Sequence, residues 1–368
     1  MKRYVVFTLC LILLALIAAG AVVGLGLFNV SARQGHLPGV YWILHTTYRN
    51  SVDLRAPSVD TVPDLTDEGL VQLGAGHYDS ACVMCHGVPG QASSPTVQHM
   101  VPMPPPIQSA VENWNPAELF WIVKNGVKMS GMPAWPTLER SDEVWPVVAF
   151  LNRVTEMDAA AYDAMLTQEA TQQTDLASLQ TYRQRCQVCH GPVGLGVEAS
   201  YVPRLDLLNE AYIKASLLAY RSGERHSGIM QQVASLLSDE EIDTLAEVVG
   251  KISGRTAPAV PPTEGVDRSA DLIAAGAKIA AGESEHRDVP ACNACHGPYP
   301  VERSELFPAL AGQHEGYILR QLELFKSDSR GGSERARLMH EVVPHLDKAQ
   351  MQSLAAYYAS LAPALDLP

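Results

Sequence analysis

The pattern Cys-x-x-Cys-His occurs three times in this chain of 368 residues. The copies begin at Cys82, Cys186 and Cys292, and a glycine follows the histidine in each of them. They contain six of the seven cysteines, and the remaining one, Cys10, lies inside an apolar run. A framework of disulfide bonds would not space its cysteines in such regular short pairs. The pattern therefore predicts three equivalent sites, each built from two thiols and one imidazole.

Each motif has the composition of an attachment site for c-type haem. Two thiols at this spacing can form thioether bonds to one porphyrin, and the adjacent histidine then lies under the iron as its proximal ligand. A zinc site needs four ligands, and each motif supplies three with no obvious fourth. A thioredoxin-like role is disfavoured because no βαβ pattern surrounds any copy. We predict three covalently bound haem c groups, attached through Cys82, Cys85, Cys186, Cys189, Cys292 and Cys295, with His86, His190 and His296 as proximal iron ligands.

The ligand on the opposite side of each iron decides between electron transfer and chemistry at an open position. A methionine follows each motif, 46, 40 and 43 residues beyond the histidine, at Met132, Met230 and Met339. Each precedes a predicted closing helix, so we predict that these methionines are the second axial ligands, which raise the reduction potential. Two alternatives remain open, Met129 in place of Met132 and His340 in place of Met339.

The motifs recur with a period of about 100 residues, the size of one small domain. In each repeat a helical segment leads into the motif, and a loop, a methionine and a closing helix follow it. The closing helices begin at Ser141, Ser238 and Asp347 and carry apolar residues at three- and four-residue spacing, which predicts one buried stripe on each. Ser238 and Glu241 also form the pattern of a capping box. No segment shows a strand pattern, so the predicted fold is all-α.

The N-terminus carries the features of a membrane anchor. Lys2 and Arg3 precede a nearly continuous apolar stretch at residues 4–28, which exceeds the roughly 20 residues that a transmembrane helix needs. The stretch is longer than the core of a signal peptide, although residues 30–32 (Val-Ser-Ala) resemble a cleavage site, so a cleaved signal is the alternative. The positive charges place the N-terminus in the cytoplasm and the haem motifs in the periplasm. We predict a single-pass protein of the bacterial cytoplasmic membrane.

The expected organisation is a transmembrane anchor, a juxtamembrane segment rich in aromatic residues and three small domains. The limits are 1–30 for the anchor, 31–62 for the juxtamembrane segment, and 63–156, 172–253 and 266–365 for the domains. A proline-rich stretch separates the last two domains and is typical of a semi-rigid spacer. Domains of this size bury only a modest core, so covalently held haem is expected to supply part of the apolar centre.

The order of parts in each repeat resembles that of a class I cytochrome c, and the resemblance extends from about residue 65 to about residue 365. The second and third repeats resemble the halves of periplasmic dihaem cytochromes c, whose pattern is Pro-x-Leu-x-x-Gln, a tyrosine and then the methionine. The third repeat keeps that pattern, and the second has Leu208 where the glutamine is expected. The matching residues are Pro203, Leu205, Tyr212 and Met230 in the second repeat, and Pro308, Leu310, Gln313, Tyr317 and Met339 in the third.

The first repeat is more distant and is similar to single-domain cytochromes with a Gly-Met-Pro loop. The whole layout is similar to that of the trihaem cytochrome subunits of membrane-bound alcohol and gluconate dehydrogenases. It departs from them in the N-terminal anchor and in the segment that follows. The resemblance implies three tandem class I cytochrome c domains behind one transmembrane helix.

The function implied by the resemblance is electron transfer in a respiratory chain. The net charge of −13 argues against nucleic-acid binding, and no small-molecule substrate is evident. Electron transfer between haems requires no general acid or base, so we predict an electron-transfer protein without a catalytic site of its own. Its expected partner is a membrane redox complex, either a dehydrogenase or a terminal oxidase. The alternatives are an independent tethered carrier and a multihaem peroxidase or reductase with an open iron.

Overall fold

The computed structural model describes residues 2–167, 179–196, 201–252, 270–284, 287–298, 304–332 and 334–363. Within these residues the chain is helical, and the one pairing of extended backbone is an isolated antiparallel bridge between Arg225 and Gly331. The predicted all-α class is confirmed for this part of the chain. The predicted domain limits at positions 172, 253, 266 and 365 lie outside the described residues.

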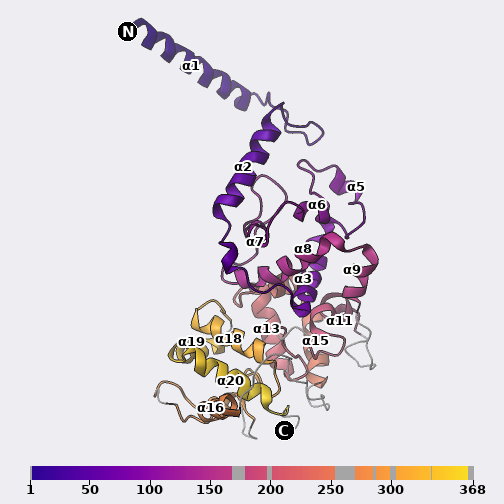
Figure 1. Cartoon of the computed structure of the whole chain (residues 1–368), viewed down its shortest axis with the longest axis vertical. Coiled ribbons are helices and arrows are strands. Elements are labelled where there is room, and N and C mark those ends of the chain that lie inside the picture. Colours follow the sequence, from indigo (N-terminus) through magenta and orange to yellow (C-terminus); the bar gives the residue numbers. More distant parts are fainter. Residues whose placement is uncertain are drawn as a thin grey trace.

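The chain begins with an apolar helix that extends away from the rest of the molecule (Figure 1). This helix, α1 (Lys2–Gly24), buries none of its residues, and its length and composition suit either a membrane span or a signal sequence. It is followed by α2 (Val40–Arg55) and the short η1 (Val59–Thr61). The C-terminal half of α2 packs on the first haem-motif unit, where the Arg49 guanidinium lies 5.0 Å from the ring centre of Trp114.

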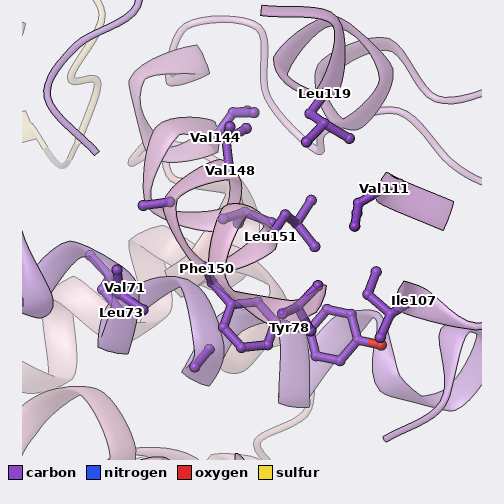
Figure 2. Close-up of a cluster of buried hydrophobic side chains, with 14 of the residues drawn as sticks. Val71, Leu73, Tyr78, Ile107, Val111, Leu119, Val144, Val148, Phe150 and Leu151 are labelled. Atoms are coloured by element: carbon purple, nitrogen blue, oxygen red, sulfur yellow. The ribbon is translucent and has the colours of Figure 1, made fainter. Parts of the chain in front are cut away.

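The first unit, residues 63–167, has its core between a leading and a closing helix. Gly74 of the leading helix lies so close to the Pro146 carbonyl of the closing helix that a side chain there would overlap it. Figure 2 shows the Tyr78 and Phe150 rings side by side at the base of this core, with centroids 5.1 Å apart and ring planes tilted by 41°. The elements are α3 (Glu68–Ala81), α4 (Val83–His86), α5 (Pro95–Gln98), α6 (Ile107–Val111), α7 (Pro116–Asn125), η2 (Ser141–Glu143), α8 (Val144–Arg153), η3 (Val154–Glu156) and α9 (Ala159–Leu166).

The second unit, residues 179–252 in their described part, has a small core of its own between α13 and α15. Its closing helix buries Ile242, Leu245 and Val249 along one stripe, as predicted. The predicted capping box is also present, because the Ser238 amide donates to Glu241 Oε2 at 2.9 Å and the Glu241 amide donates to Ser238 Oγ at 3.2 Å. The elements are α11 (Gln180–Arg185), α12 (Gln187–His190), α13 (Glu210–Ser222), α14 (Gly228–Ser235) and α15 (Asp239–Ile252).

The third unit, residues 270–363 in their described part, is organised around α20. This helix buries six consecutive residues, 353–358, so the prediction of a single buried stripe is wrong for it. The reason is that α20 packs against both α16 and α18, and α8 in the first unit is buried in the same way between α3 and α7. The elements are α16 (Ala270–Ala280), α17 (Asn293–His296), α18 (Glu315–Lys326), η4 (Glu334–Ala336), α19 (Arg337–Val342), η5 (Val343–His345) and α20 (Lys348–Ser360).

Buried and half-buried polar contacts join the three units. Gln313 of the third unit bonds the backbone of Arg204 in the second, accepting from its amide at 2.9 Å and donating to its carbonyl at 3.1 Å. Arg320 of the third unit pairs with Asp142 of the first at 2.9 Å. Buried polar groups need partners, so these contacts position the units relative to one another. The glutamine that the sequence matched to a family pattern thus bonds the neighbouring unit.

Candidate haem sites

Each Cys-x-x-Cys-His motif ends a leading segment with a single helical turn, namely α4, α12 or α17. The glycine after each histidine has φ between 75° and 77°, a left-handed region in which other residues are strained. In the first two units a buried tyrosine of the leading helix closes the turn. Tyr78 donates to the Gly87 carbonyl at 2.5 Å, and Tyr182 donates to the Gly191 carbonyl at 2.6 Å. In the third unit Tyr358 of the closing helix bonds Asn293 of the motif instead, at 2.9 Å.

Each of the three motif histidines makes a hydrogen bond of the same kind. Each places its Nδ1 near the carbonyl oxygen of a proline in the following loop. The distances are 2.9 Å for His86 and Pro105, 3.4 Å for His190 and Pro203, and 2.9 Å for His296 and Pro308. A carbonyl oxygen only accepts hydrogen bonds, so Nδ1 carries the proton and Nε2 keeps its lone pair for a metal. Metal-binding histidines commonly donate their other ring nitrogen in this way.

The acceptor role of these prolines was missed by sequence reasoning. The prolines lie 19, 13 and 12 residues beyond their histidines, and this uneven spacing hides the repeat. Pro203 and Pro308 were noted only as part of a family pattern. A proline beyond each motif is the signal that could have identified them.

Burial sets the protonation of the motif side chains. It raises the pKa of Cys186 and Cys189 to about 12, so both thiols stay protonated at neutral pH. It has the same effect on Cys82, and it raises the pKa of Cys292 to about 11. Burial also lowers the pKa of His190 to about 4, which keeps its imidazole neutral. Within the described residues no cluster of three histidine, cysteine or carboxylate groups is arranged to hold a metal ion.

In the third unit the structure brings all the predicted site residues to one cavity. Cys292, Cys295, His296 and Met339 line a cavity of about 330 Å³. The rest of the lining is mainly apolar and includes Leu310, Ile318, Leu322, Phe325 and Leu354. Three arginines and three tyrosines also line it, namely Arg225, Arg330, Arg335, Tyr212, Tyr317 and Tyr358. An apolar cavity with a thiol pair, an imidazole and a thioether fits haem c, and the arginines suit its carboxylates.

The cavity of the second site is lined by all three units. Cys189, His190 and Met230 line a cavity of about 650 Å³, and Cys186 lies at the start of the same helical turn. Leu73 of the first unit and Arg320 of the third unit lie in the same lining. The second site is therefore the central one, and its surroundings depend on how the units pack.

At the first site the loop geometry distinguishes the two candidate methionines. Met129 has φ 62° and is 87% exposed, whereas Met132 is half-buried. The loop closes on itself, because the Val127 amide donates to the Met132 carbonyl at 3.2 Å. This conformation favours Met132 over Met129. The pairing of Met132 with His86 stays a prediction, whereas the motif and the methionine of the second and third sites each line one cavity.

The methionines of the other two units lie on helices. Met230 is the third residue of α14, and Met339 is the third residue of α19. Each therefore lies on a short helix of its own ahead of the closing helix, which the sequence pattern did not predict. Met339 lines the third cavity, whereas His340 places its Nδ1 3.0 Å from Asp328, which favours Met339 as the ligand.

The chain is similar to several known c-type cytochromes. The family profile described as "Cytochrome C oxidase, cbb3-type, subunit III" matches residues 69–151. Two proteins named "Thiosulfate dehydrogenase electron acceptor" are similar to the chain. That of Stutzerimonas stutzeri (strain A1501) is 30% identical over 59% of this chain and 94% of its own length, and that of Thiomonas intermedia (strain K12) is 35% identical over 48% and 77%. Cytochrome c-552 of Acidithiobacillus ferridurans is 33% identical over 48% of this chain and 73% of its own.

Proposed function

The chain belongs to the cytochrome c family, whose members bind haem c covalently, and on this premise we propose that it is a membrane-anchored trihaem electron carrier of the periplasm. The observation that carries the proposal is that each of the three motif histidines places Nδ1 at the carbonyl oxygen of a proline, which puts the proton on Nδ1 and makes Nε2 the ring nitrogen suited to bind iron. A single-haem protein would not need this arrangement three times. The relatives account for about half of this chain, so its role as a whole is a proposal.

The proposed ligands are those that the sequence identified. The six motif cysteines would form the thioether bonds, and the three motif histidines, together with Met132, Met230 and Met339, would bind the irons. When bound, haem iron supplies a one-electron couple. The chain's own residues hold the ligands in place and exclude water, and the apolar lining at the third site disfavours the charged form of the iron and so helps to set its potential.

We propose that residues 1–30 are retained as the anchor, that residues 31–62 lie next to the membrane, and that the three units are the haem domains. The first turns of α2 support the juxtamembrane assignment. Tyr41 and Trp42 there are 66% and 68% exposed, and aromatic side chains of this kind favour the membrane–water interface.

The proposed donor is a periplasmic dehydrogenase. Two relatives are named as electron acceptors of thiosulfate dehydrogenase, which makes that enzyme the first donor to test. The match of the first unit to a terminal-oxidase subunit profile supports transfer onward to an oxidase. The direction from donor to oxidase is therefore part of the proposal.

Purification from native membranes in a gentle detergent tests this function. We expect a dehydrogenase to co-elute, and we expect thiosulfate with thiosulfate dehydrogenase to reduce the ferric protein under anaerobic conditions. Co-elution of oxidase subunits alone would place the protein on the delivery side. Elution alone, without reduction by the dehydrogenase, would contradict the subunit proposal and favour an independent carrier.

Replacing Met132 with alanine is expected to open the first iron while leaving its haem attached. The thioether bonds are untouched, so carbon monoxide should bind to one additional haem of the reduced protein and the potential of that haem should fall. Met129→Ala is the matched control, since Met129 is exposed in the same loop. Spectra taken under carbon monoxide check the assignment, and a response of Met129→Ala in place of Met132→Ala would contradict it.

Replacing residues 1–30 with a cleavable signal peptide is expected to release the haem-loaded protein into the soluble periplasm. The reason is that α1 is the apolar helix long enough to hold the chain in a bilayer within the described residues. Cell fractionation with haem staining measures the release. A native protein that is already soluble and begins near Arg33 would instead show that residues 1–32 are a removed signal.

A further inference from the structure

A buried carboxylate of the first unit lies at the start of the helix that carries Met230 in the second. This carboxylate, Glu143, ends η2 just ahead of the closing helix of the first unit and is 9% exposed. Its partners are the first residues of α14, which are buried as well. Ser227, the N-cap of that helix, is 2% exposed. The contact therefore links two units at a point three residues from a proposed axial ligand.

The hydrogen bonds at this contact form a continuous chain. Ser227 Oγ donates to Glu143 Oε1 at 2.7 Å, and the amides of Gly228 and Ile229 donate to Glu143 Oε2 at 2.6 and 3.3 Å. The Met230 amide donates in turn to Ser227 Oγ at 3.0 Å. The first amides of a helix have no carbonyl partner within the helix itself. Glu143 and Ser227 together supply the acceptors for the first three amides of α14. The negative charge also suits the positive end of the helix dipole.

The surroundings hold the carboxylate in place. Arg140 pairs with Glu143 at 2.8 Å and donates to the His226 carbonyl at 3.2 Å, so it bonds both sides of the contact. The indole of Trp135 lies against Gly228, where a side chain would overlap it. Hydrogen bonds to a charged group are stronger than those between neutral groups. The first turn of α14 therefore has one orientation as long as the first unit is docked.

We propose that Glu143 is a positioning residue for Met230, so that docking of the first unit controls the axial ligation of the second haem. The first turn of α14 sets the direction of the Met230 side chain, and Glu143 sets the orientation of that turn. The inference rests on the proposed function, because it assumes that Met230 binds iron. It adds that the ligation of one domain depends on a residue of another.

The test compares Glu143→Gln and Ser227→Ala in the full-length chain. Glu143→Gln removes the negative charge and puts an NH2 donor in place of one accepting oxygen. Ser227→Ala removes the hydroxyl that lies between Glu143 and the Met230 amide. Two readouts apply: the red absorption band and potential of methionine-ligated ferric haem, and amide hydrogen exchange at residues 228–230. We expect exchange to accelerate roughly tenfold or more, the effect of losing one hydrogen bond to a charged group. We also expect the methionine band to fall by the contribution of one haem and that haem to bind carbon monoxide.

A control separates positioning from general damage. Glu241→Gln weakens the capping box of α15 in the second unit without touching α14. It should not change the methionine band. An unchanged band in both test variants, with or without faster exchange, would overturn the proposal. If the unaltered protein lacks methionine ligation at the second haem, the proposed ligand fails, whereas the exchange readout still tests whether Glu143 holds the helix.

Discussion

Replacing Cys186 and Cys189 with serine is expected to lower the haem content from three to two per chain. Serine cannot form the thioether bonds, and the cavity of about 650 Å³ at this site would lose the group that fills it. Because residues of all three units line that cavity, the loss should also loosen their packing and slow electron exchange between the two remaining haems. Haem quantification and intact mass measure the first effect, and the kinetics of reduction by a rapid donor measure the second.

The matched control is the same replacement at Cys292 and Cys295. It should also remove one haem, but the first and second haems should still exchange electrons, because the third unit's cavity is lined by the second and third units. Equal slowing in both double variants would contradict the central position of the second site. Retention of three haems in either variant would contradict attachment through these cysteines.

Replacing Met230 with alanine is expected to leave all three haems attached and to change the chemistry of one. The thioether sulfur that raises the potential is removed, so the midpoint potential of the second haem should fall by at least roughly 60 mV, a tenfold change for a one-electron couple. The open position should bind carbon monoxide in the reduced protein without denaturant. Potentiometric titration and carbon monoxide spectra check both effects.

Met351→Ala provides the control for methionine loss in general. Met351 is a buried residue of α20, 4% exposed, and its removal should lower the unfolding temperature without opening an iron. A Met230→Ala protein with an unchanged potential and spectrum would show that another group binds the second iron. Opening of an iron by Met351→Ala would show that these readouts respond to loss of packing.

The sequence was sufficient for the parts of the protein that depend on local chemistry. Three Cys-x-x-Cys-His motifs predict covalent attachment of haem, because the two thiols and the histidine lie within five residues and can be recognised without any tertiary contact. The capping box at Ser238 and Glu241 is likewise local, and it is present as predicted. The apolar N-terminal helix follows from composition alone.

The sequence did not predict which residues orient the motif histidines. The carbonyls of Pro105, Pro203 and Pro308 accept from them after loops of different length, so the spacing of these prolines does not reveal the repeat. The burial of α8 and α20 on several faces was missed for a related reason. A helix packed between two others has no single apolar stripe, although stripes are what periodicity detects.

Sequence by itself therefore determined the number and chemistry of the candidate haem sites, the helical class and the apolar N-terminus. Only the tertiary structure showed that the second site is central and that Glu143, 87 residues before Met230, holds the start of its helix. Motif chemistry acts within a few residues of chain and is readable from order and spacing. Contacts between units depend on how separately folded helices meet, and a buried carboxylate acquires its role from the amides that it meets there.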